Sequence, residues 1–309
     1  MSKLLIVFGA TGQQGGSVVR QVLHDSELSK QYTIRAITRD ASTPKAQELK
    51  KSGVEIVEAD LTKKSTLNTA LKGGHTIFVM TAPSFGPGAK DSEITQGKTV
   101  ADIAVEEGIK YMIFSTLPSC TRISNGKYTK VTAFDAKAEI QDYISTLPLK
   151  SAFFAPGSFM QNFQGVMIPR PTGSGDYIMT THVSPKTELP LIDITGDTGK
   201  YIGAILAEPD KYEGKTFCAS TEVLTMDEMA QTISRVSGKT VKYVQIPEEA
   251  YRKHLPGWAD ILIEMMLYQQ DFGYYGPGTR DLVGWAAENA RGRLSTFEEY
   301  LIANPLPLE

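Results

Sequence analysis

The first sixteen residues are the part of the sequence that most constrains its fold. The run from Lys3 to Phe8 is almost entirely apolar and fits a short buried strand, because it is too short for a helix of ordinary length. It leads directly into the glycine-rich segment 9–16, and a helical pattern follows to about Leu23. A strand, a glycine turn and a helix in this order predict a site where the helix N-terminus faces a phosphate group.

The glycines of this turn are the evidence for a dinucleotide. Three of them let the backbone turn sharply and approach a bulky group closely. The residues expected to contact a dinucleotide pyrophosphate are Gly9, Thr11, Gly12, Gln13, Gln14 and Gly15. Ordinary strand-to-helix turns also use glycine, so a purely structural turn is the alternative.

Composition restricts the classes of protein that fit this sequence. The 309 residues are 41% hydrophobic and 22% charged, which is typical of a folded globular chain. A net charge of -3 gives no basic field for nucleic acid, so no direct nucleic-acid binding is expected. Cys120 and Cys218 share no metal-binding or disulfide motif, and no run approaches the roughly 20 apolar residues of a membrane span. We therefore expect a cytoplasmic protein, with nuclear entry left open, and neither a metal site nor a membrane anchor.

Strand and helix signals alternate through the first half of the chain. Helical patterns separate apolar runs that fit strands at 33–38, 54–58, 76–81, 111–115 and 151–155. Asp91 is expected to cap a long helix that Gly108 ends. This alternation predicts an α/β fold of the Rossmann type, a doubly wound parallel sheet with helices on both faces.

The pattern changes after Pro156. Glycine and proline become frequent between 157 and 190, and mixed strand and helix signals follow. Thr225 and Glu228 have the spacing of a capping box and predict the start of a helix. We therefore predict an NADP-binding Rossmann domain over 1–155 and a smaller α/β C-terminal domain over 156–309, with the chain crossing between the two.

Arg39 and the residues after the third strand bear on the choice of dinucleotide. An acidic residue at the end of the second strand favours NAD(H), whereas the arginine found there accommodates the 2′-phosphate of NADP(H). We therefore expect NADP(H) to be preferred over NAD(H); the alternative is a surface arginine paired with Asp40. Asp60 and Leu61 fit the place of an adenine, although Asp60 equally suits a helix cap.

Small residues end the fourth predicted strand. Thr81, Ala82 and Pro83 lie beside the path expected for the dinucleotide, and their size permits a close approach. The same three residues also suit an ordinary strand end.

Beyond these local patterns, the sequence resembles the NmrA-like family, atypical members of the short-chain dehydrogenase/reductase superfamily. The resemblance rests on the segments 9–15, 38–39, 96–98, 133–137, 156–162, 197–199 and 272–277. It implies an NADP(H)-binding domain, a smaller C-terminal domain and a cleft between them. The founding fungal member regulates nitrogen-metabolism genes by binding a transcription factor, a human relative is described as a redox sensor, and other relatives are reductases.

The superfamily's catalytic Tyr-x-x-x-Lys motif is incomplete in this sequence. By resemblance Lys137 occupies the lysine position, but Ala133 stands where the tyrosine would be and supplies no proton. Lys137 is expected to bind the ribose hydroxyls of the cofactor, with an ordinary helix lysine as the alternative. Ser115 resembles the superfamily's serine near the nicotinamide. Tyr128, in the loop before this helix, is the candidate for a replacement acid, or else a loop aromatic.

The segment after the sixth strand is the last candidate part of the cofactor site. By resemblance it lies beside the nicotinamide, with Pro156 at its start and Phe159 as a stacking side chain. A hydrophobic hinge is the alternative role for the same residues.

Two main hypotheses for function follow. The first is an NADP(H)-binding redox or dinucleotide sensor that acts through a regulatory protein partner, since the cofactor turn is intact and the catalytic tyrosine is absent. The second is an NADPH-dependent reductase of a small apolar carbonyl, quinone or imine, in which water supplies the proton. Direct DNA binding is a weak third, because the net charge is negative.

Overall fold

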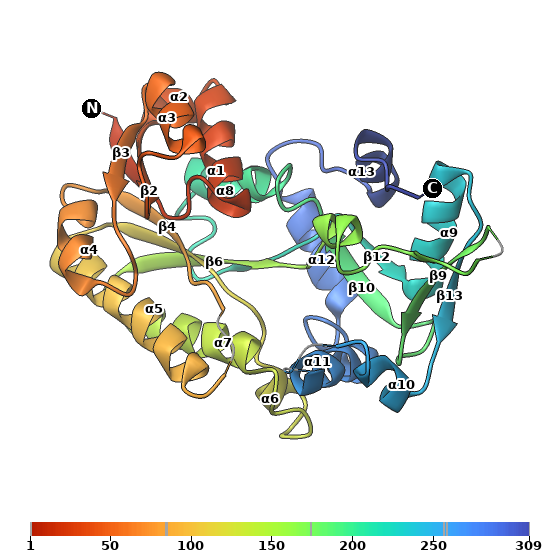
Figure 1. The fold of residues 1–309 in the computed structure, drawn as a ribbon. Helices are drawn as coiled ribbons and strands as arrows, with labels where there is room; N and C mark the ends of the chain where they lie inside the picture. The colour runs from red at the N-terminus through yellow and green to blue at the C-terminus, as the bar shows by residue number, and fades with distance from the viewer. Residues whose placement is uncertain (1, 84–85, 174, 256, 258, 309) are drawn as a thin grey trace.

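A parallel sheet organises the larger part of the molecule (Figure 1). The computed structural model describes residues 2–83, 86–173, 175–255, 257 and 259–308. Within these residues the sheet has seven strands. In sheet order they are β11 (Thr216–Ala219), β6 (Lys150–Pro156), β5 (Tyr111–Ser115), β4 (Thr76–Met80), β1 (Lys3–Val7), β2 (Tyr32–Thr38) and β3 (Glu55–Glu58). Every neighbouring pair is parallel, so the predicted Rossmann-type fold is confirmed.

The burial of each strand follows from its place in the sheet. The central strands β4 and β5 are apolar along almost their whole length, and Phe78 and Phe114 are fully buried. Continuous apolar runs are typical of parallel strands that are covered on both faces. The edge strand β3 instead exposes Glu55 and Glu58 at its two ends.

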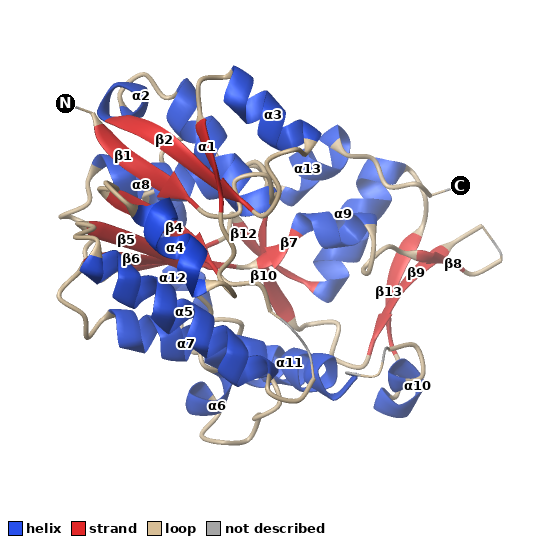
Figure 2. Cartoon of the chain, turned by 60° about the vertical axis from the view of Figure 1, so that its left-hand side comes forward, coloured by secondary structure: helices blue, strands red, loops and turns tan. Residues whose placement is uncertain are grey.

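Helices cover both faces of the sheet (Figures 1 and 2). One layer packs on a core that includes Val18, Tyr201 and Ala286. The other layer packs on a core that includes Leu67 and Ile140. The first layer holds α1 (Gln13–His24), α2 (Leu28–Gln31), α3 (Pro44–Lys51), α8 (Thr198–Ala207) and α12 (Thr279–Glu288). The second holds α4 (Lys64–Leu71), α5 (Ala89–Glu106) and α7 (Thr132–Ile144), and α6 (Cys120–Ile123) precedes α7 in the chain.

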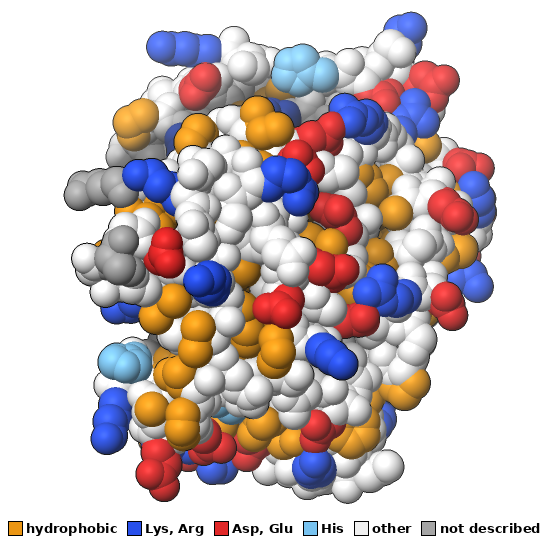
Figure 3. All heavy atoms as spheres, turned by 90° about the vertical axis from the view of Figure 1, so that its right-hand side faces the viewer, with side chains coloured by type: hydrophobic (Ala, Val, Ile, Leu, Met, Phe, Trp, Pro, Cys, Tyr) orange, Lys and Arg blue, Asp and Glu red, His pale blue; other side chains and the backbone are white. Residues whose placement is uncertain are grey.

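Two small sheets and several helices form the rest of the molecule. Within the described residues, none of the helices has the length and hydropathy of a membrane span. One sheet joins β12 (Glu222–Thr225), β10 (Glu188–Ile192) and β7 (Ser158–Phe159), and the other joins β13 (Val241–Gln245), β9 (Tyr177–Thr181) and β8 (Arg170–Pro171). They are accompanied by the 3-10 helix Met160–Gln164, α9 (Met226–Ser237), α10 (Glu248–Arg252), α11 (Ala259–Phe272) and α13 (Phe297–Ala303). Lysine and arginine side chains alternate with aspartate and glutamate across this end of the molecule (Figure 3).

The chain returns to the large sheet after residue 156. Strand β11 pairs with β6, and α8 packs against α1. Near the C-terminus, Arg291 donates hydrogen bonds to Asp25 and Glu27, and this pairing lowers the pKa of Asp25 to about 2. Residues after 156 therefore complete the larger unit, and the division between 155 and 156 stays a prediction.

The starts of two helices test the capping residues that the sequence predicted. The capping box of Thr225 and Glu228 is present at the start of α9, as predicted. The expectation that Asp91 caps a long helix here is wrong, because α5 already begins at Ala89. Gly88, with φ of +74°, holds the N-cap position and Asp91 lies in the first turn. Aspartate is favourable at both places, so its presence did not locate the boundary.

We expect Gly199→Ala to lower the free energy of unfolding by about 1–3 kcal/mol, because overpacking strains a close contact. An added Cβ at Gly199 of α8 would lie 2.4 Å from the carbonyl oxygen of Ser17 on α1. The matched control is Gly284→Ala in α12, where a Cβ meets nothing within 4 Å; there alanine is expected to add up to about 1 kcal/mol. Urea unfolding measures both. A Gly199→Ala variant as stable as wild type would contradict this packing.

Candidate functional site

The carboxyl edge of the large sheet brings most of the predicted site residues together. Strands β1, β2 and β3 run to one side of the sheet and β4, β5 and β6 to the other, so the chain order reverses between β1 and β4. Ligands of open α/β sheets bind at this point, outside the carboxyl ends of the strands. The residues that end or follow the six strands are Gly9, Arg39, Asp60, Thr81, Ser115 and Pro156.

The glycine turn after β1 is as tight as its sequence suggests. Gly9 has φ of +60°, and the Gly12 amide donates a hydrogen bond to the Gly9 carbonyl oxygen at 2.8 Å. A Cβ at Gly15 would lie 2.4 Å from that oxygen and 2.5 Å from the carbonyl oxygen of Phe8. Only glycine therefore lets α1 approach the end of β1 this closely.

The N-terminus of α1 lacks an internal partner for its charge. Gly12 provides no side-chain cap, and the first turn contains no acidic residue, so amides at this end face outward. The side-chain oxygen of Gln14 is buried and has no hydrogen-bond partner among the described residues. Thr11 is half-buried and Gln13 is exposed beside it. This end of the helix fits an anionic group, and a sugar hydroxyl would supply the donor that Gln14 lacks.

Arg39 is exposed and forms no hydrogen bond or ion pair with a described residue. The alternative pairing with Asp40 is absent, because the Asp40 carboxylate accepts hydrogen bonds from the amide and hydroxyl of Ser42. The guanidinium is thus free to bind a phosphate at the end of β2.

Asp60 stabilises the turn after β3. Its carboxylate accepts from the amide of Thr62 at 2.9 Å and from the Thr62 hydroxyl at 2.8 Å. These bonds, together with the charges of Lys63 and Arg39, lower the pKa of Asp60. Helix α4 begins at Lys64, so Asp60 is not its N-cap. Leu61 is half-buried against the core of the sheet, and the adenine contacts of both residues stay predictions.

Lys137 lies in a buried polar cluster at the carboxyl end of β4. Its ammonium donates to the Thr81 carbonyl oxygen at 3.1 Å, to the Thr81 hydroxyl at 3.0 Å, and to the Glu93 carboxylate. The Thr81 hydroxyl in turn donates to Glu93 at 2.6 Å. Burial lowers the pKa of Lys137, and the Glu93 carboxylate opposes that shift. An ammonium has three N–H donors, so those of Lys137 are all used within the protein.

Glu93 is the site residue that sequence reasoning missed. It lies on α5, is only 2% exposed, and forms the buried ion pair with Lys137. Glutamate is common on solvent-facing helix surfaces, and nothing in its spacing set Glu93 apart. Ala82 and Pro83, the other small residues predicted here, are exposed beside Thr81.

Tyr128, the candidate replacement acid, is bonded to a residue of the C-terminal part of the chain. The Tyr128 hydroxyl donates to the Asp271 carboxylate on α11 at 2.6 Å, and its ring packs edge-on against Tyr268 and Phe272. Burial and the bond to Asp271 raise the pKa of Tyr128, which disfavours its anion. Ala133, at the tyrosine position, is half-buried in the first turn of α7. The role of Tyr128 as a replacement acid stays a prediction.

The end of β6 connects the two parts of the molecule. The Tyr274 and Tyr275 hydroxyls donate to the carbonyl oxygens of Pro156 and Ala155 at 3.2 and 2.8 Å. Phe159 belongs to β7, which pairs with β10 of a small sheet, while its half-buried side chain packs on the core beneath α1. This arrangement suits the hinge alternative, and nicotinamide stacking by Phe159 stays a prediction. Ser115 is buried at the end of the neighbouring strand β5.

The fold is that of a Rossmann-type protein, with a glycine turn at the carboxyl end of its first strand. A model of the NmrA-like family matches residues 1–301, and the chain belongs to this family. An NmrA-like family domain-containing protein of Dictyostelium discoideum is 33% identical over 309 residues, covering 97% of each chain. An NmrA-like oxidoreductase of Malbranchea aurantiaca is 29% identical over 276 residues, 85% of this chain and 78% of that protein.

Solved structures share the fold at lower identity. The negative transcriptional regulator NmrA in complex with NADP has a TM-score of 0.82 at 23% identity, covering 99% of each chain. NmrA with NAD has a TM-score of 0.83 at 22% identity, covering 99% of this chain and 96% of that one. Triphenylmethane reductase of Citrobacter sp. with NADP(H) has a TM-score of 0.75 at 20% identity, covering 98% of this chain and all of that one.

We expect Lys137→Met to lower the free energy of unfolding by about 3–5 kcal/mol, because it leaves the buried Glu93 carboxylate uncompensated. The double variant Lys137→Met/Glu93→Met removes both charges and is expected to recover most of that loss. The control is Lys98→Met, which breaks an exposed pair with Glu139 and costs less than about 1 kcal/mol. Denaturant unfolding checks all three. Equal losses for Lys137→Met and Lys98→Met would show that the pair is not buried.

Proposed function

We propose that this chain is an NADP(H)-binding protein that senses the dinucleotide and acts through contacts with another protein. One observation supports the proposal: among the described residues the N-terminus of α1 and Arg39 are unpaired, whereas Lys137 is bound to internal partners and Ala133 supplies no proton. Lys137 is held by Thr81 and Glu93, and Ala133 replaces the acid.

The preference for NADP(H) rests on Arg39. A planar guanidinium matches phosphate oxygens, and an exposed arginine that forms no hydrogen bond or ion pair with a described residue can reach a 2′-phosphate at little cost. NmrA itself has been crystallised with either NAD or NADP, so the family fold accommodates both dinucleotides. The preference of this chain for NADP(H) or NAD(H) therefore depends on its own residues at the end of β2.

Arg39→Ala is expected to weaken NADPH binding by about tenfold to a hundredfold, because a charge-assisted hydrogen bond contributes about 1.5–3 kcal/mol. NADH binding should change by less than about threefold. Isothermal titration calorimetry of both dinucleotides measures the effect. Arg122→Ala, which removes an exposed arginine paired with Asp142, serves as the control. An equal loss for NADPH and NADH would mean that Arg39 does not contact the 2′-phosphate.

The end of β6 is the segment that couples dinucleotide binding to the affinity for a protein partner. Phe159 pairs with a small sheet through its backbone and packs on the large unit through its side chain. Tyr274 and Tyr275 hold the preceding carbonyls from the C-terminal part of the chain. A dinucleotide that contacts this segment favours one arrangement of the two parts, and linkage then changes the affinity for a partner.

A reductase is the second candidate. Fungal relatives such as that of Malbranchea aurantiaca are named oxidoreductases, and triphenylmethane reductase shares the fold. NADPH supplies a hydride when it is bound. An acceptor that is already activated needs no protein acid at the moment of reduction, so water can provide any proton. The absence of tyrosine at Ala133 is compatible with this chemistry.

We expect the purified chain to bind NADPH without consuming it when quinones, imines and apolar aldehydes are supplied. The absorbance of NADPH at saturating dinucleotide measures turnover, and Gly12→Asp, which places a carboxylate at the phosphate site, gives the background. Steady consumption that Gly12→Asp abolishes would contradict the sensor and favour the reductase. In that case Tyr128→Phe would show whether Tyr128 provides the proton.

A further inference from the structure

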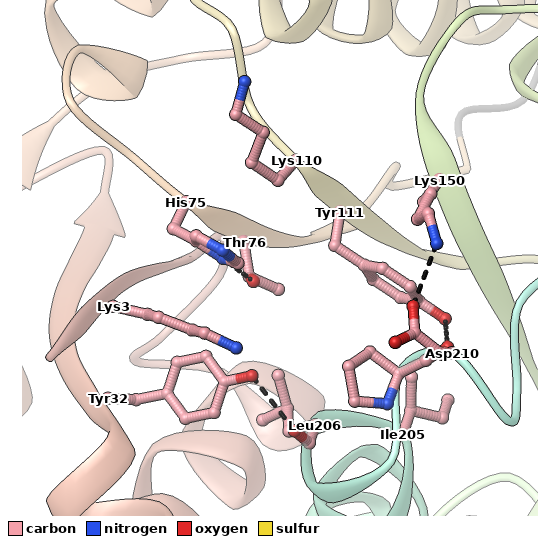
Figure 4. A pocket seen from close by; sticks show the side chains of 11 residues that line it. Lys3, Tyr32, His75, Thr76, Lys110, Tyr111, Lys150, Ile205, Leu206 and Asp210 are labelled. Atoms are coloured by element: carbon pink, nitrogen blue, oxygen red, sulfur yellow. Dashed lines mark hydrogen bonds and ion pairs between the residues drawn. The ribbon is translucent and has the colours of Figure 1, made fainter.

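A pocket lies at the amino edge of the large sheet, opposite the carboxyl-edge site (Figure 4). Its volume is about 220 Å³. It lies where β1, β2, β4, β5 and β6 begin and α8 ends, and the 209–210 segment closes one side. The lining residues are Lys3, Tyr32, His75, Thr76, Lys110, Tyr111, Lys150, Ile205, Leu206, Pro209 and Asp210.

The floor of this pocket is apolar, and its two tyrosine hydroxyls donate hydrogen bonds to backbone carbonyl oxygens. The Tyr32 hydroxyl donates to the carbonyl oxygen of Leu206 at 3.0 Å, and that of Tyr111 donates to Pro209 at 2.9 Å. Both tyrosines and Leu206 are buried. Their rings and aliphatic groups line the floor of the pocket, and the hydrogen bonds to backbone carbonyl oxygens hold the rings in place.

The charged groups of the pocket are unbalanced toward positive charge. Lys3 and His75 point into the hollow, and Lys110 extends outward at its rim (Figure 4). Neither lysine forms a hydrogen bond or ion pair with a described residue. The one carboxylate among the lining residues, Asp210, is bound to Lys150 at 2.9 Å, and Lys150 also contacts Glu213. Among the described residues, Lys3 and Lys110 thus form no ion pair: the Lys3 ammonium lies 5.8 Å from the centre of the Tyr32 ring, and Asp210 is already paired with Lys150.

We propose that this pocket binds a small organic acid in which one carboxylate is carried on an aromatic or other apolar body. The carboxylate would meet the Lys3 ammonium and the His75 ring, and the body would lie against Tyr32 and Tyr111. An ammonium and an imidazole supply charge-assisted donors for a carboxylate, which are the stronger class of hydrogen bond. Small-molecule sites combine an apolar lining with a few convergent polar groups in this way.

His75 is a natural reporter of such an anion. Its Nδ1 atom lies 2.9 Å from the Thr76 hydroxyl, which leaves Nε2 for a ligand. Burial and the charges of Lys3 and Lys110 lower the pKa of His75. The remaining neighbours are the neutral phenols and the Lys150–Asp210 pair, so a bound carboxylate adds the missing negative charge. Its arrival stabilises the imidazolium and raises the pKa of His75.

The test uses three probes and the titration of His75 by NMR. Benzoate carries both a carboxylate and an aromatic ring, benzamide keeps the ring without the charge, and acetate keeps the charge with almost no apolar body. The signal of His75 is assigned with His75→Gln, since the chain has four histidines. We expect benzoate to bind saturably and raise the pKa of His75, acetate to bind more weakly, and benzamide to leave that pKa unchanged.

Variants locate the binding site. Lys3→Met is expected to weaken benzoate binding about fivefold, the size of an exposed ion contact. Lys51→Met, at an exposed lysine on α3, should leave it unchanged. Gly12→Asp should also leave it unchanged, which separates this pocket from the dinucleotide site. Equal responses to benzoate and benzamide, no response of His75, or full affinity in Lys3→Met would each overturn the proposal.

Discussion

The close contact between Gly15 and the end of β1 is the constraint on which the site depends. A Cβ at Gly15 would lie within 2.6 Å of backbone atoms of Gly9 and Phe8, so the approach of α1 to the strand requires glycine. This approach brings the uncapped N-terminus of α1 to the point where the order of the strands reverses. The same helix is held from its other side by Gly199 of α8, so residues from both halves of the chain fix the site.

The buried pair of Lys137 and Glu93 gives the retained lysine a structural explanation. All three ammonium donors bind Thr81 and Glu93, which ties α5 and α7 to the end of β4. Conversion of this lysine into a cofactor contact would have to break at least one of these bonds. A chain with Ala133 in place of the acid, and with Lys137 paired to Glu93, is better suited to binding a dinucleotide than to protonating a product.

Local sequence signals predicted the parallel sheet, several element bounds and the glycine turn, because periodicity and turn chemistry act within a few residues. Strand β5 has the predicted bounds 111–115. Features that depend on contacts between distant segments were not accessible. No local signal marks Glu93, because its partner Lys137 lies on α7, and no local signal links Tyr128 to Asp271 on α11. The sequence predicted that the chain crosses between the two parts, but not that β11 pairs with β6.

The central claim is that the carboxyl edge of the sheet binds NADP(H) through the glycine turn and Arg39 without a protein acid at the nicotinamide. A crystal structure of the NADPH complex tests it most directly. The account predicts the pyrophosphate at the amides that begin α1, the 2′-phosphate on Arg39, and Lys137 still bonded to Glu93. A dinucleotide bound away from Gly12, or a Tyr128 hydroxyl that has left Asp271 for the nicotinamide, would contradict it.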